Sequence, residues 1–242
     1  MVRLESINTQ SDTSISIQID RTPKVYEQAD EIERAWQSLC AQNPRYFNGS
    51  MLAFDSYDAG TGVIHARAEQ YKHHAVRDVI DTGISLLAVT ALLAAPGPSE
   101  DSSPVYMLGK RSSELHRYGN LWELGPCGGV DVPNQRDTLT AAGIWGEIKR
   151  EIQEEIGVMV SSPAQHPIAL VHDNAVGSTD IVIPIRLQSV PAVRTNWEYT
   201  DIRWVTLDEL TAWIETSPSE LIPTTSAIAR HLAEIRARES ND

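Results

Sequence analysis

The chain has 242 residues, of which 41% are hydrophobic and 22% charged, and this globular composition excludes wholesale disorder. A formal net charge of −13 disfavours nucleic acid as a partner, because an acidic surface repels a phosphate backbone. The longest apolar stretch, residues 84–95, is too short to span a bilayer, and the first ten residues have no signal-like apolar core. Cys40 and Cys127 match no zinc spacing and are interpreted as reduced thiols. We therefore expect no membrane association and a cytoplasmic location.

The first 80 residues predict a small α+β unit. Alternation of apolar and polar residues predicts a strand over residues 13–20, and a helix follows Pro23 and extends to about Cys40. Asn48-Gly49 predicts a tight turn into a strand, and the turn at residues 60–62 leads to a second strand at 63–68. A short helix is expected over residues 73–80. We therefore expect an N-terminal domain over residues 1–80 and a second domain over residues 81–242.

The second domain begins with the apolar stretch 84–95, which predicts a buried central strand that forms a hairpin with a strand at 105–109. The glycine-rich bend W-E-L-G-P-C-G-G-V then precedes a helix from about 139 to 156, which Gly157 ends. Thr206 and Glu209 form a capping-box pattern at the start of one later helix. The remaining expected elements are strands at 168–171, 180–187 and 202–205 and helices at 206–215 and 224–238. This interleaving predicts an α/β/α layered domain.

The helix before Gly157 carries two sequence patterns. An isoleucine recurs at every fourth position and predicts a core stripe, which consists of Ile144, Ile148, Ile152 and Ile156. Glutamates at i, i+4, i+7 and i+8 occupy another face, and these are Glu147, Glu151, Glu154 and Glu155. Like charges at this spacing repel, although Arg150 can pair with Glu147 or Glu154. Such crowding suits a divalent cation with hard oxygen ligands, Mg²⁺ or Mn²⁺, and the alternative is an acidic surface helix.

The segment R-E-I-Q-E-E-I-G-V at residues 150–158 resembles the second half of the signature of the Nudix hydrolases, whose pattern is R-E-(apolar)-x-E-E-x-G-(apolar). The first half departs from that signature. Ala142 stands where the family has a glutamate, and Gly129 lies 21 residues before Arg150 where the family has 14. The loop therefore holds an insertion of about seven residues. Either Glu147 or Asp131 could supply the missing carboxylate.

The resemblance implies a Nudix-type α/β/α sandwich and a diphosphatase that uses Mg²⁺ or Mn²⁺. Glu151, Glu154 and Glu155 would bind the metal, and Arg150 would orient a ligating glutamate. The backbone near Gly129 would approach the metal or a phosphate closely. The resemblance leaves the base or extra ligand open among three residues, which are Glu147, Asp180 and Glu198.

The segment N-P-R-Y-F-N-G at residues 43–49 and the lengthened loop resemble one Nudix branch, the UDP-sugar diphosphatases related to the animal UDP-glucose/UDP-galactose hydrolase. This implies a small-molecule substrate, a nucleoside diphosphate linked to a sugar, cleaved to a nucleoside monophosphate and a sugar phosphate. Arg111 could meet phosphate, Tyr71 could stack on a base and Asn48 could contact the substrate. Strand-end charge, core packing and turn chemistry are the alternatives for these three residues.

Two other functions compete with the nucleotide-sugar hypothesis. The first is a Nudix hydrolase of ADP-ribose or another nucleoside diphosphate derivative. The second, motivated by Ala142 and the stretched loop, is a non-catalytic Nudix-like binding or regulatory module. Apolar residues of the N-terminal unit could cover the active site or form the face of a homodimer, and the sequence leaves both open.

Overall fold

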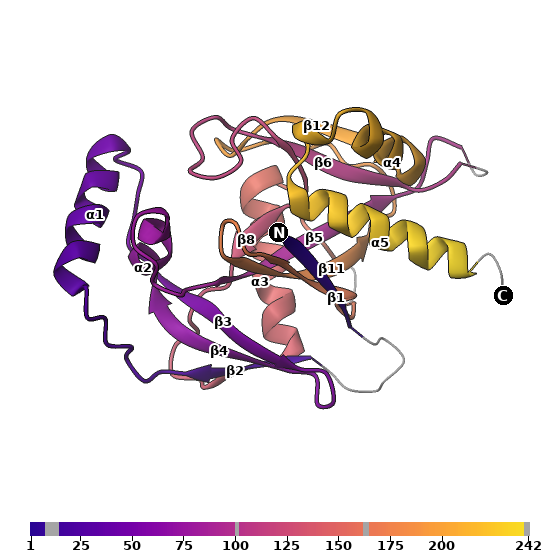
Figure 1. The fold of residues 1–242 in the computed structure, drawn as a ribbon. Helices are drawn as coiled ribbons and strands as arrows, with labels where there is room; N and C mark the ends of the chain where they lie inside the picture. Colours follow the sequence, from indigo (N-terminus) through magenta and orange to yellow (C-terminus); the bar gives the residue numbers. More distant parts are fainter. Residues whose placement is uncertain (8–14, 100–101, 162–164, 240–242) are drawn as a thin grey trace.

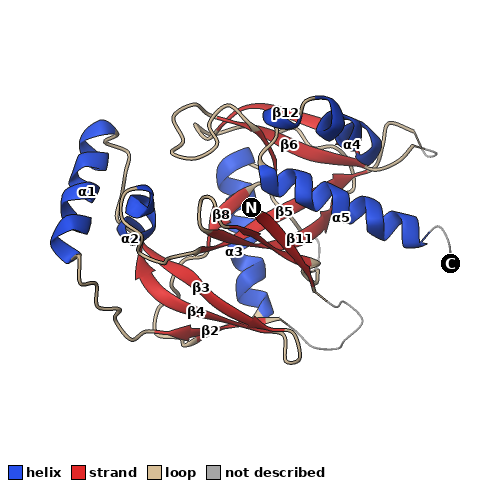
Figure 2. Ribbon diagram, in the orientation of Figure 1, coloured by secondary structure: helices blue, strands red, loops and turns tan. Residues whose placement is uncertain are grey.

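The computed structural model describes residues 1–7, 15–99, 102–161 and 165–239 (Figures 1 and 2). A mixed sheet forms the centre of the molecule and helices lie on both of its faces, which confirms the predicted α/β/α layers. The strands are β1 (Val2–Ser6), β2 (Ser16–Asp20), β3 (Ser50–Asp58), β4 (Val63–Gln70), β5 (Leu86–Ala95), β6 (Val105–Arg111), β7 (Trp122–Leu124), β8 (Cys127–Gly129), β9 (Thr138–Leu139), β10 (Ala169–Asp173), β11 (Ser178–Arg186) and β12 (Tyr199–Thr206). The helices are α1 (Ala29–Gln42), α2 (Tyr71–Ala75), η1 (Val76–Asp78), α3 (Ala141–Ile156), α4 (Leu207–Thr216), η2 (Pro218–Glu220) and α5 (Pro223–Glu239). None of the helices in this described part is long and apolar enough to cross a bilayer.

Strand β5 is the buried central strand that the apolar stretch predicts. Within the order β1-β10-β11-β5-β3-β4-β2-β9, it pairs in parallel with β11 and antiparallel with β3. It also pairs antiparallel with β6 and β8, which lie outside this order. The predicted hairpin with β6 is paired only next to its connecting loop, through the pairs Ala94–Tyr106 and Ala95–Val105. Strand β6 then leaves β5 and pairs with β12 and β7. Strand β8 instead pairs with Ala88, Val89 and Thr90 of β5.

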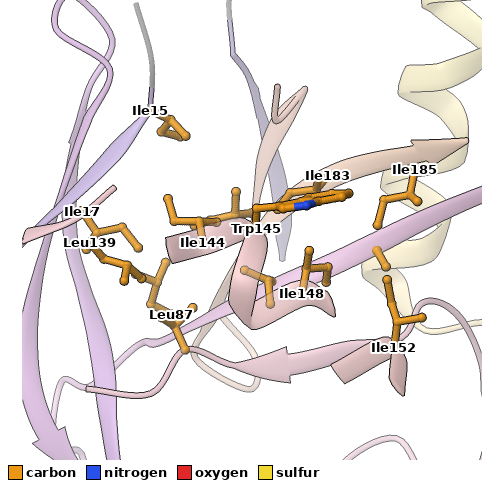
Figure 3. Close-up of a cluster of buried hydrophobic side chains, with 14 of the residues drawn as sticks. Ile15, Ile17, Leu87, Leu139, Ile144, Trp145, Ile148, Ile152, Ile183 and Ile185 are labelled. Atoms are coloured by element: carbon orange, nitrogen blue, oxygen red, sulfur yellow. The ribbon is translucent and has the colours of Figure 1, made fainter. Parts of the chain in front are cut away.

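Two hydrophobic clusters lie on the two faces of the sheet. One packs the isoleucine stripe of α3 against β5 and β11, with Leu87 and Ile183 among the contacting residues (Figure 3). The other packs α4 and α5 against the opposite face, where Leu92 of β5 lies. Because successive side chains of a strand point to opposite faces, a continuous apolar strand such as β5 supplies both clusters.

The N-terminal unit extends the same sheet. Helices α1 and α2 pack on each other through a small cluster that contains Ile32, Trp36 and Val76, at one end of the molecule (Figure 1). Strand β3 continues the sheet from β5 through the pair Ala53–Leu86. The domain boundary near residue 80 stays a prediction, and two strands cross it: β1 pairs with β10, and β9 pairs with β2.

Several element ends differ from the predictions. The helix expected from about residue 139 begins at Ala141, because Leu139 pairs with Ile17 in β9. Strand β1 was not predicted, and the first two residues of the strand expected at 13–20 lie outside the described residues. The capping box of α4 is confirmed, since Glu209 N donates to Thr206 Oγ1 at 3.2 Å and Thr206 N donates to Glu209 Oε2 at 2.7 Å.

Candidate functional site

Helix α3 directs two glutamates inward. Glu151 and Glu155 are 8% and 3% exposed, whereas the side chain of Glu154 is 57% exposed. Residues one helical turn apart point in the same direction, so Glu151 and Glu155 form one buried acidic pair. The helix ends at Gly157, whose φ of 69° is in the left-handed region and confirms the predicted stop.

Burial makes both buried glutamates difficult to ionise. Desolvation raises the pKa of Glu151 to about 7, with the charge of Glu198 adding to the effect and that of Arg150 opposing it. Desolvation and the charge of Glu198 raise the pKa of Glu155 well above its usual range. Two such carboxylates side by side are stabilised when a cation or a proton neutralises them.

Arg150 is the main cation of this cluster. Its Nη2 lies 2.7 Å from Glu151 Oε1 and 3.0 Å from Glu147 Oε2, and its Nη1 lies 3.1 Å from Glu154 Oε2. Asp131 Oδ2 is 3.5 Å from the same guanidinium. Both helix-spaced pairs that the sequence suggests are therefore formed. The guanidinium also pairs with Glu151, while the positioning role that the resemblance implies for Arg150 stays a prediction.

Of the two adjacent glycines, Gly128 is the one at which a side chain would clash with a buried glutamate. A Cβ on Gly128 would lie 2.1 Å from Glu151 Cδ and 2.3 Å from Glu151 Oε2, whereas a Cβ on Gly129 would meet only Leu86 Cδ1 at 3.3 Å. Strand β8 carries both residues along β5. The close approach to a carboxylate thus occurs at Gly128, and the site role of Gly129 stays a prediction.

Glu123 on β7 is a buried acid that sequence reasoning missed. It is 2% exposed, accepts two hydrogen bonds of 2.7 Å from Arg111 Nη1, and accepts a third from Tyr199 Oη at 2.8 Å. The Tyr199 hydroxyl also contacts Glu155 and so joins the two acids. A charged residue inside the apolar bend W-E-L-G-P was the available signal, because an unpaired charge is rarely buried.

The three alternatives for a base occupy different surroundings. Glu198 is half-buried, its charge acts on both Glu151 and Glu155, and burial raises its own pKa. Asp180 is buried on β11 and accepts hydrogen bonds from Thr90 at 3.2 Å and Ser178 at 3.1 Å. Glu147 is half-buried and paired with Arg150. Of the three, Glu198 is the acid whose charge acts on both buried glutamates without a paired arginine at hydrogen-bond distance.

The predicted substrate residues already have partners within the protein, although Arg111 and Tyr71 both line one cavity. Arg111 is held by Glu123, and Tyr71 is partly buried and stacks on Tyr46 with ring centroids 6.5 Å apart. The amide of Asn48 is used internally: its Oδ1 accepts from Lys72 N at 2.9 Å and its Nδ2 donates to Gln70. Substrate contact by these residues stays a prediction.

Two adjoining cavities lie beside the buried glutamates. The outer chamber, of about 400 Å³, is lined by residues that include Tyr46, Phe47, Asp131, Arg150, Glu151 and Trp197. The inner chamber, of about 210 Å³, is lined by residues that include His74, Arg111, His116, Arg117, Glu123 and Gly128. Both chambers include Tyr71, Leu86, Leu115, His116 and Gly129 in their walls, so these residues lie between the two chambers.

The acidic side chains fit a hard divalent cation. Within the described ranges, no three His, Cys, Asp or Glu side chains are already grouped around one point as a metal site. Mg²⁺, however, needs only one or two protein carboxylates, with water and substrate oxygens completing its shell. Glu151 and Glu155 offer such a pair, and the absence of a side chain on Gly128 lets the Glu151 carboxylate pack against the backbone of β8.

A scan against models of protein families finds no match for this chain, and a search of the curated proteins finds none. Among solved structures, the chain is similar to the Nudix hydrolase RenU from M. smegmatis, with 20% identity and a TM-score of 0.45 over 62% of this chain and 85% of that one. The MutT protein from Methanosarcina mazei Go1 gives 19% identity and a TM-score of 0.46, over 63% and 95% of the two chains. An Ap4A hydrolase from C. elegans gives 13% and 0.43, over 63% and 98%. These likenesses leave the activity of the chain open.

Proposed function

We propose that this chain is a Nudix-type hydrolase that uses Mg²⁺ or Mn²⁺ to cleave the diphosphate of a nucleoside diphosphate derivative. One observation carries the proposal: Glu151 and Glu155 are buried one helical turn apart on α3, and the carboxylate of Glu151 fits against Gly128, which has no side chain. A purely structural helix gains nothing from two adjacent buried carboxylates, because each costs free energy when it is ionised without a partner.

Glu151 and Glu155 would hold the cation, and Glu154 is the further ligand that the Nudix resemblance implies. When bound, the cation would polarise the diphosphate oxygens and lower the pKa of an attacking water. Arg150 holds the Glu151 carboxylate in place through its contact of 2.7 Å. The Tyr199 hydroxyl, which lies between Glu123 and Glu155, restricts the second carboxylate in the same way.

Glu198 is the proposed general base. Its carboxylate would accept the proton of the attacking water, since a raised pKa brings a carboxylate closer to the value at which it exchanges protons near neutral pH. Asp180 and Glu147 are less suited, because hydrogen bonds to Ser178 and Thr90 hold the first and Arg150 holds the second. A Glu198→Gln variant tests this role: the expected result is a strongly reduced kcat with Mg²⁺ affinity largely retained.

A nucleotide sugar such as UDP-glucose is the proposed substrate. Support comes from the position of the 43–49 segment, because Asn43, Phe47 and Gly49 line the outer chamber together with Glu151. This places the segment that resembles the UDP-sugar branch next to the proposed metal ligands. The cytoplasmic location stays a prediction that accompanies this substrate.

A panel of substrates and three variants test the proposal. The protein is incubated with Mg²⁺ or Mn²⁺ and UDP-glucose, other nucleotide sugars, ADP-ribose or dinucleotides, and the nucleoside monophosphate released is measured. We expect highest kcat/KM with a nucleotide sugar, and losses of more than about 100-fold in Glu151→Gln and Glu155→Gln. Glu215→Gln, on the exposed side of α4, is the control and should retain activity.

Two outcomes would contradict parts of this proposal. A preference for ADP-ribose would retain the hydrolase and replace the nucleotide sugar. Metal-independent turnover, or turnover unchanged in Glu151→Gln and Glu155→Gln, would remove the catalytic role of α3. Absence of turnover on the whole panel, together with tight nucleotide binding, would indicate the non-catalytic binding module instead.

A further inference from the structure

The inner chamber lies where the N-terminal unit meets the rest of the sheet. Helix α2 contributes His74, the segment between β6 and β7 contributes His116 and Arg117, and β8 contributes Gly128. The wall that contains Gly129 and Leu86 is common to the inner and outer chambers. A ligand that extends past Gly128 from the buried glutamates would therefore reach these basic side chains.

Several nitrogen atoms on this wall are buried without a hydrogen-bond partner among the residues that the structure describes. They are His74 Nδ1, His116 Nε2, and Arg117 Nε and Nη2. His74 is 6% exposed, so water does not readily solvate it. Arg117 and His116 both face one carboxylate, Asp78, which pairs with Arg117 and lies 3.9 Å from His116 Nε2. The two Arg117 nitrogens are always donors, and a neutral histidine ring has one donor nitrogen. Buried donors are nearly always paired, so the Arg117 nitrogens point to a ligand that accepts hydrogen bonds.

The acids of the inner chamber already have partners. Glu123 accepts from Arg111 and Tyr199. Asp173 accepts from the Tyr118 hydroxyl and from Ala175 N, the latter at 3.0 Å. Asp180 accepts from Ser178 and Thr90. These carboxylates are thus directed to other donors, and Arg117 Nε and Nη2 are left as buried donors without a described partner.

The segment that carries His116 and Arg117 is held in a restrained conformation. Tyr118 and Asn120 have φ angles of 54° and 66°, in the left-handed region that residues other than glycine rarely adopt. Arg111 Nε donates to the Arg117 carbonyl at 3.3 Å, and the Tyr118 hydroxyl donates to Asp173. Backbone strain of this kind persists where surrounding contacts impose it, and it occurs often at ligand-binding sites.

Two arginines and one aspartate lie near His74. Burial and the charges of Arg77 and Arg117 lower the pKa of His74 to about 4 against the opposing charge of Asp78, so its ring is neutral near pH 7. Burial also lowers the pKa of His116. A neutral ring can donate one hydrogen bond without adding charge. An anion in the chamber would offset the local excess of positive charge.

We propose that the inner chamber binds a phosphate group of the substrate through Arg117, His116 and His74, so that the N-terminal unit completes the substrate site. The inference rests on the proposed function, because the diphosphate would lie between the buried glutamates and this basic wall. Arg117 and His116 are binding residues in this view, and α2 positions His74 against them. The ligand chemistry is that of a phosphate monoester or diester anion.

Binding of inorganic phosphate to the metal-free protein tests this inference. Isothermal titration in EDTA removes the metal site from the measurement, and glucose 1-phosphate serves as a second probe. We expect wild-type protein to bind both, with affinity about tenfold weaker or more in Arg117→Gln and His116→Gln. Arg67→Gln is the matched control: the Arg67 side chain is 25% exposed and that of Arg117 22%, and each pairs with an aspartate. Its phosphate affinity should equal that of the wild type.

Turnover assays distinguish a failure of this inference from a failure of the proposed function. In the metal-loaded protein, Arg117→Lys should raise KM for the nucleotide sugar more than it lowers kcat, and Glu155→Gln should abolish turnover while it retains phosphate binding. Phosphate affinity that is undetectable in wild type, or equal in wild type, Arg117→Gln and His116→Gln, overturns the inference even if turnover is normal. If Arg117→Gln fails to fold by circular dichroism, His116→Gln decides the test by the same criterion.

Discussion

The carboxylate of Glu151 lies directly against the backbone of Gly128, so that a single added carbon on Gly128 would be 2.1 Å from Glu151 Cδ. Helix α3 and strand β8 can approach each other in this way only because residue 128 has no side chain. The contact joins Glu151 of α3 to Gly128 of the glycine-rich bend. The long loop between β8 and α3 separates these two elements along the chain. It also makes a glycine substitution a specific probe of the site.

Gly128→Ala should impair metal binding more than folding. The clash is with the end of a flexible side chain, so Glu151 can rotate away at modest cost, but its carboxylate then leaves the acidic pair. We expect Mg²⁺ affinity and kcat/KM to fall by about 10- to 100-fold, the range seen when groups that orient metal ligands are lost. Titration with Mn²⁺ and steady-state assays measure these two quantities.

Gly146→Ala is the matched control for that substitution. Gly146 lies in the exposed face of α3, and a Cβ there would meet nothing within 4 Å. Alanine has the higher helix propensity, so the free energy of unfolding should rise by about 0.5–1 kcal/mol with unchanged activity. Equal losses of activity in both variants would mean that the Glu151–Gly128 contact has no particular role.

Glu151 should make the metal-free protein less stable as pH rises. Its pKa in the folded protein is about 7 against an ordinary value of 4.5, so between these values the folded state holds a proton that the unfolded chain has lost. The contribution is fully present below about pH 4.5 and is lost as pH rises through 7, with a difference on the order of 3 kcal/mol. Denaturant unfolding in EDTA from pH 5 to 8 measures this slope.

Two comparisons check that Glu151 causes this slope. Glu151→Gln should be more stable than wild type at pH 8 without metal, and its stability should vary less between pH 5 and 7. Millimolar Mg²⁺ should raise the melting temperature of wild type more at pH 8 than at pH 5.5, because metal competes with the proton for the carboxylate. A wild-type stability that rises from pH 5 to 7 in EDTA would contradict the assignment.

Arg150→Gln should move the pH dependence of metal binding upward. The charge of Arg150 is the contribution that lowers the pKa of Glu151, against burial and three neighbouring glutamates. Without it, we expect the midpoint of Mg²⁺ binding to shift by on the order of one pH unit or more to higher pH. Lys149→Gln removes a charge from the exposed side of the same helix and should leave the midpoint in place. Identical profiles for the two variants would show that only the net charge of α3 matters.

The elements with strong local patterns were predictable from the sequence. The isoleucines of α3 and the apolar run of β5 define buried faces by periodicity alone, and both occupy the core. The capping box of Thr206 and Glu209 and the stop at Gly157 involve only neighbouring residues. The layering of the second domain follows from these elements because each has one face or both faces to bury.

The remainder depends on contacts between distant residues. Strand β1 is short and pairs with β10, some 170 residues away along the chain, so no local pattern marks it. Glu123 gains its role from Arg111 and Tyr199, which lie on other strands. His74 meets Arg117 only because α2 packs against the segment between β6 and β7. Sequence periodicity records burial within an element, whereas these sites arise from the arrangement of several elements.

Removing one partner of the Glu123–Arg111 ion pair should lower the free energy of unfolding strongly, whereas replacing both partners should lower it much less. The side chains are 3% and 18% exposed, so Glu123→Gln leaves a largely buried guanidinium without its anion. We expect a loss of about 3–5 kcal/mol in the free energy of unfolding, compared with less than about 1 kcal/mol for Asp55→Asn, which breaks the more exposed pair with Arg67.

The double variant Glu123→Leu, Arg111→Met separates a role of the ion pair in stability from a role in activity. Apolar residues of similar volume often replace a buried ion pair at little cost, so the double variant should recover most of the stability that Glu123→Gln loses. It should nevertheless stay inactive, because Tyr199 loses the acceptor that holds its hydroxyl beside Glu155. Unfolding curves and turnover are measured for the wild type, Glu123→Gln and the double variant. A stable and fully active double variant would show that the pair only fills the core, whereas a stable and inactive one assigns it to positioning the buried glutamates.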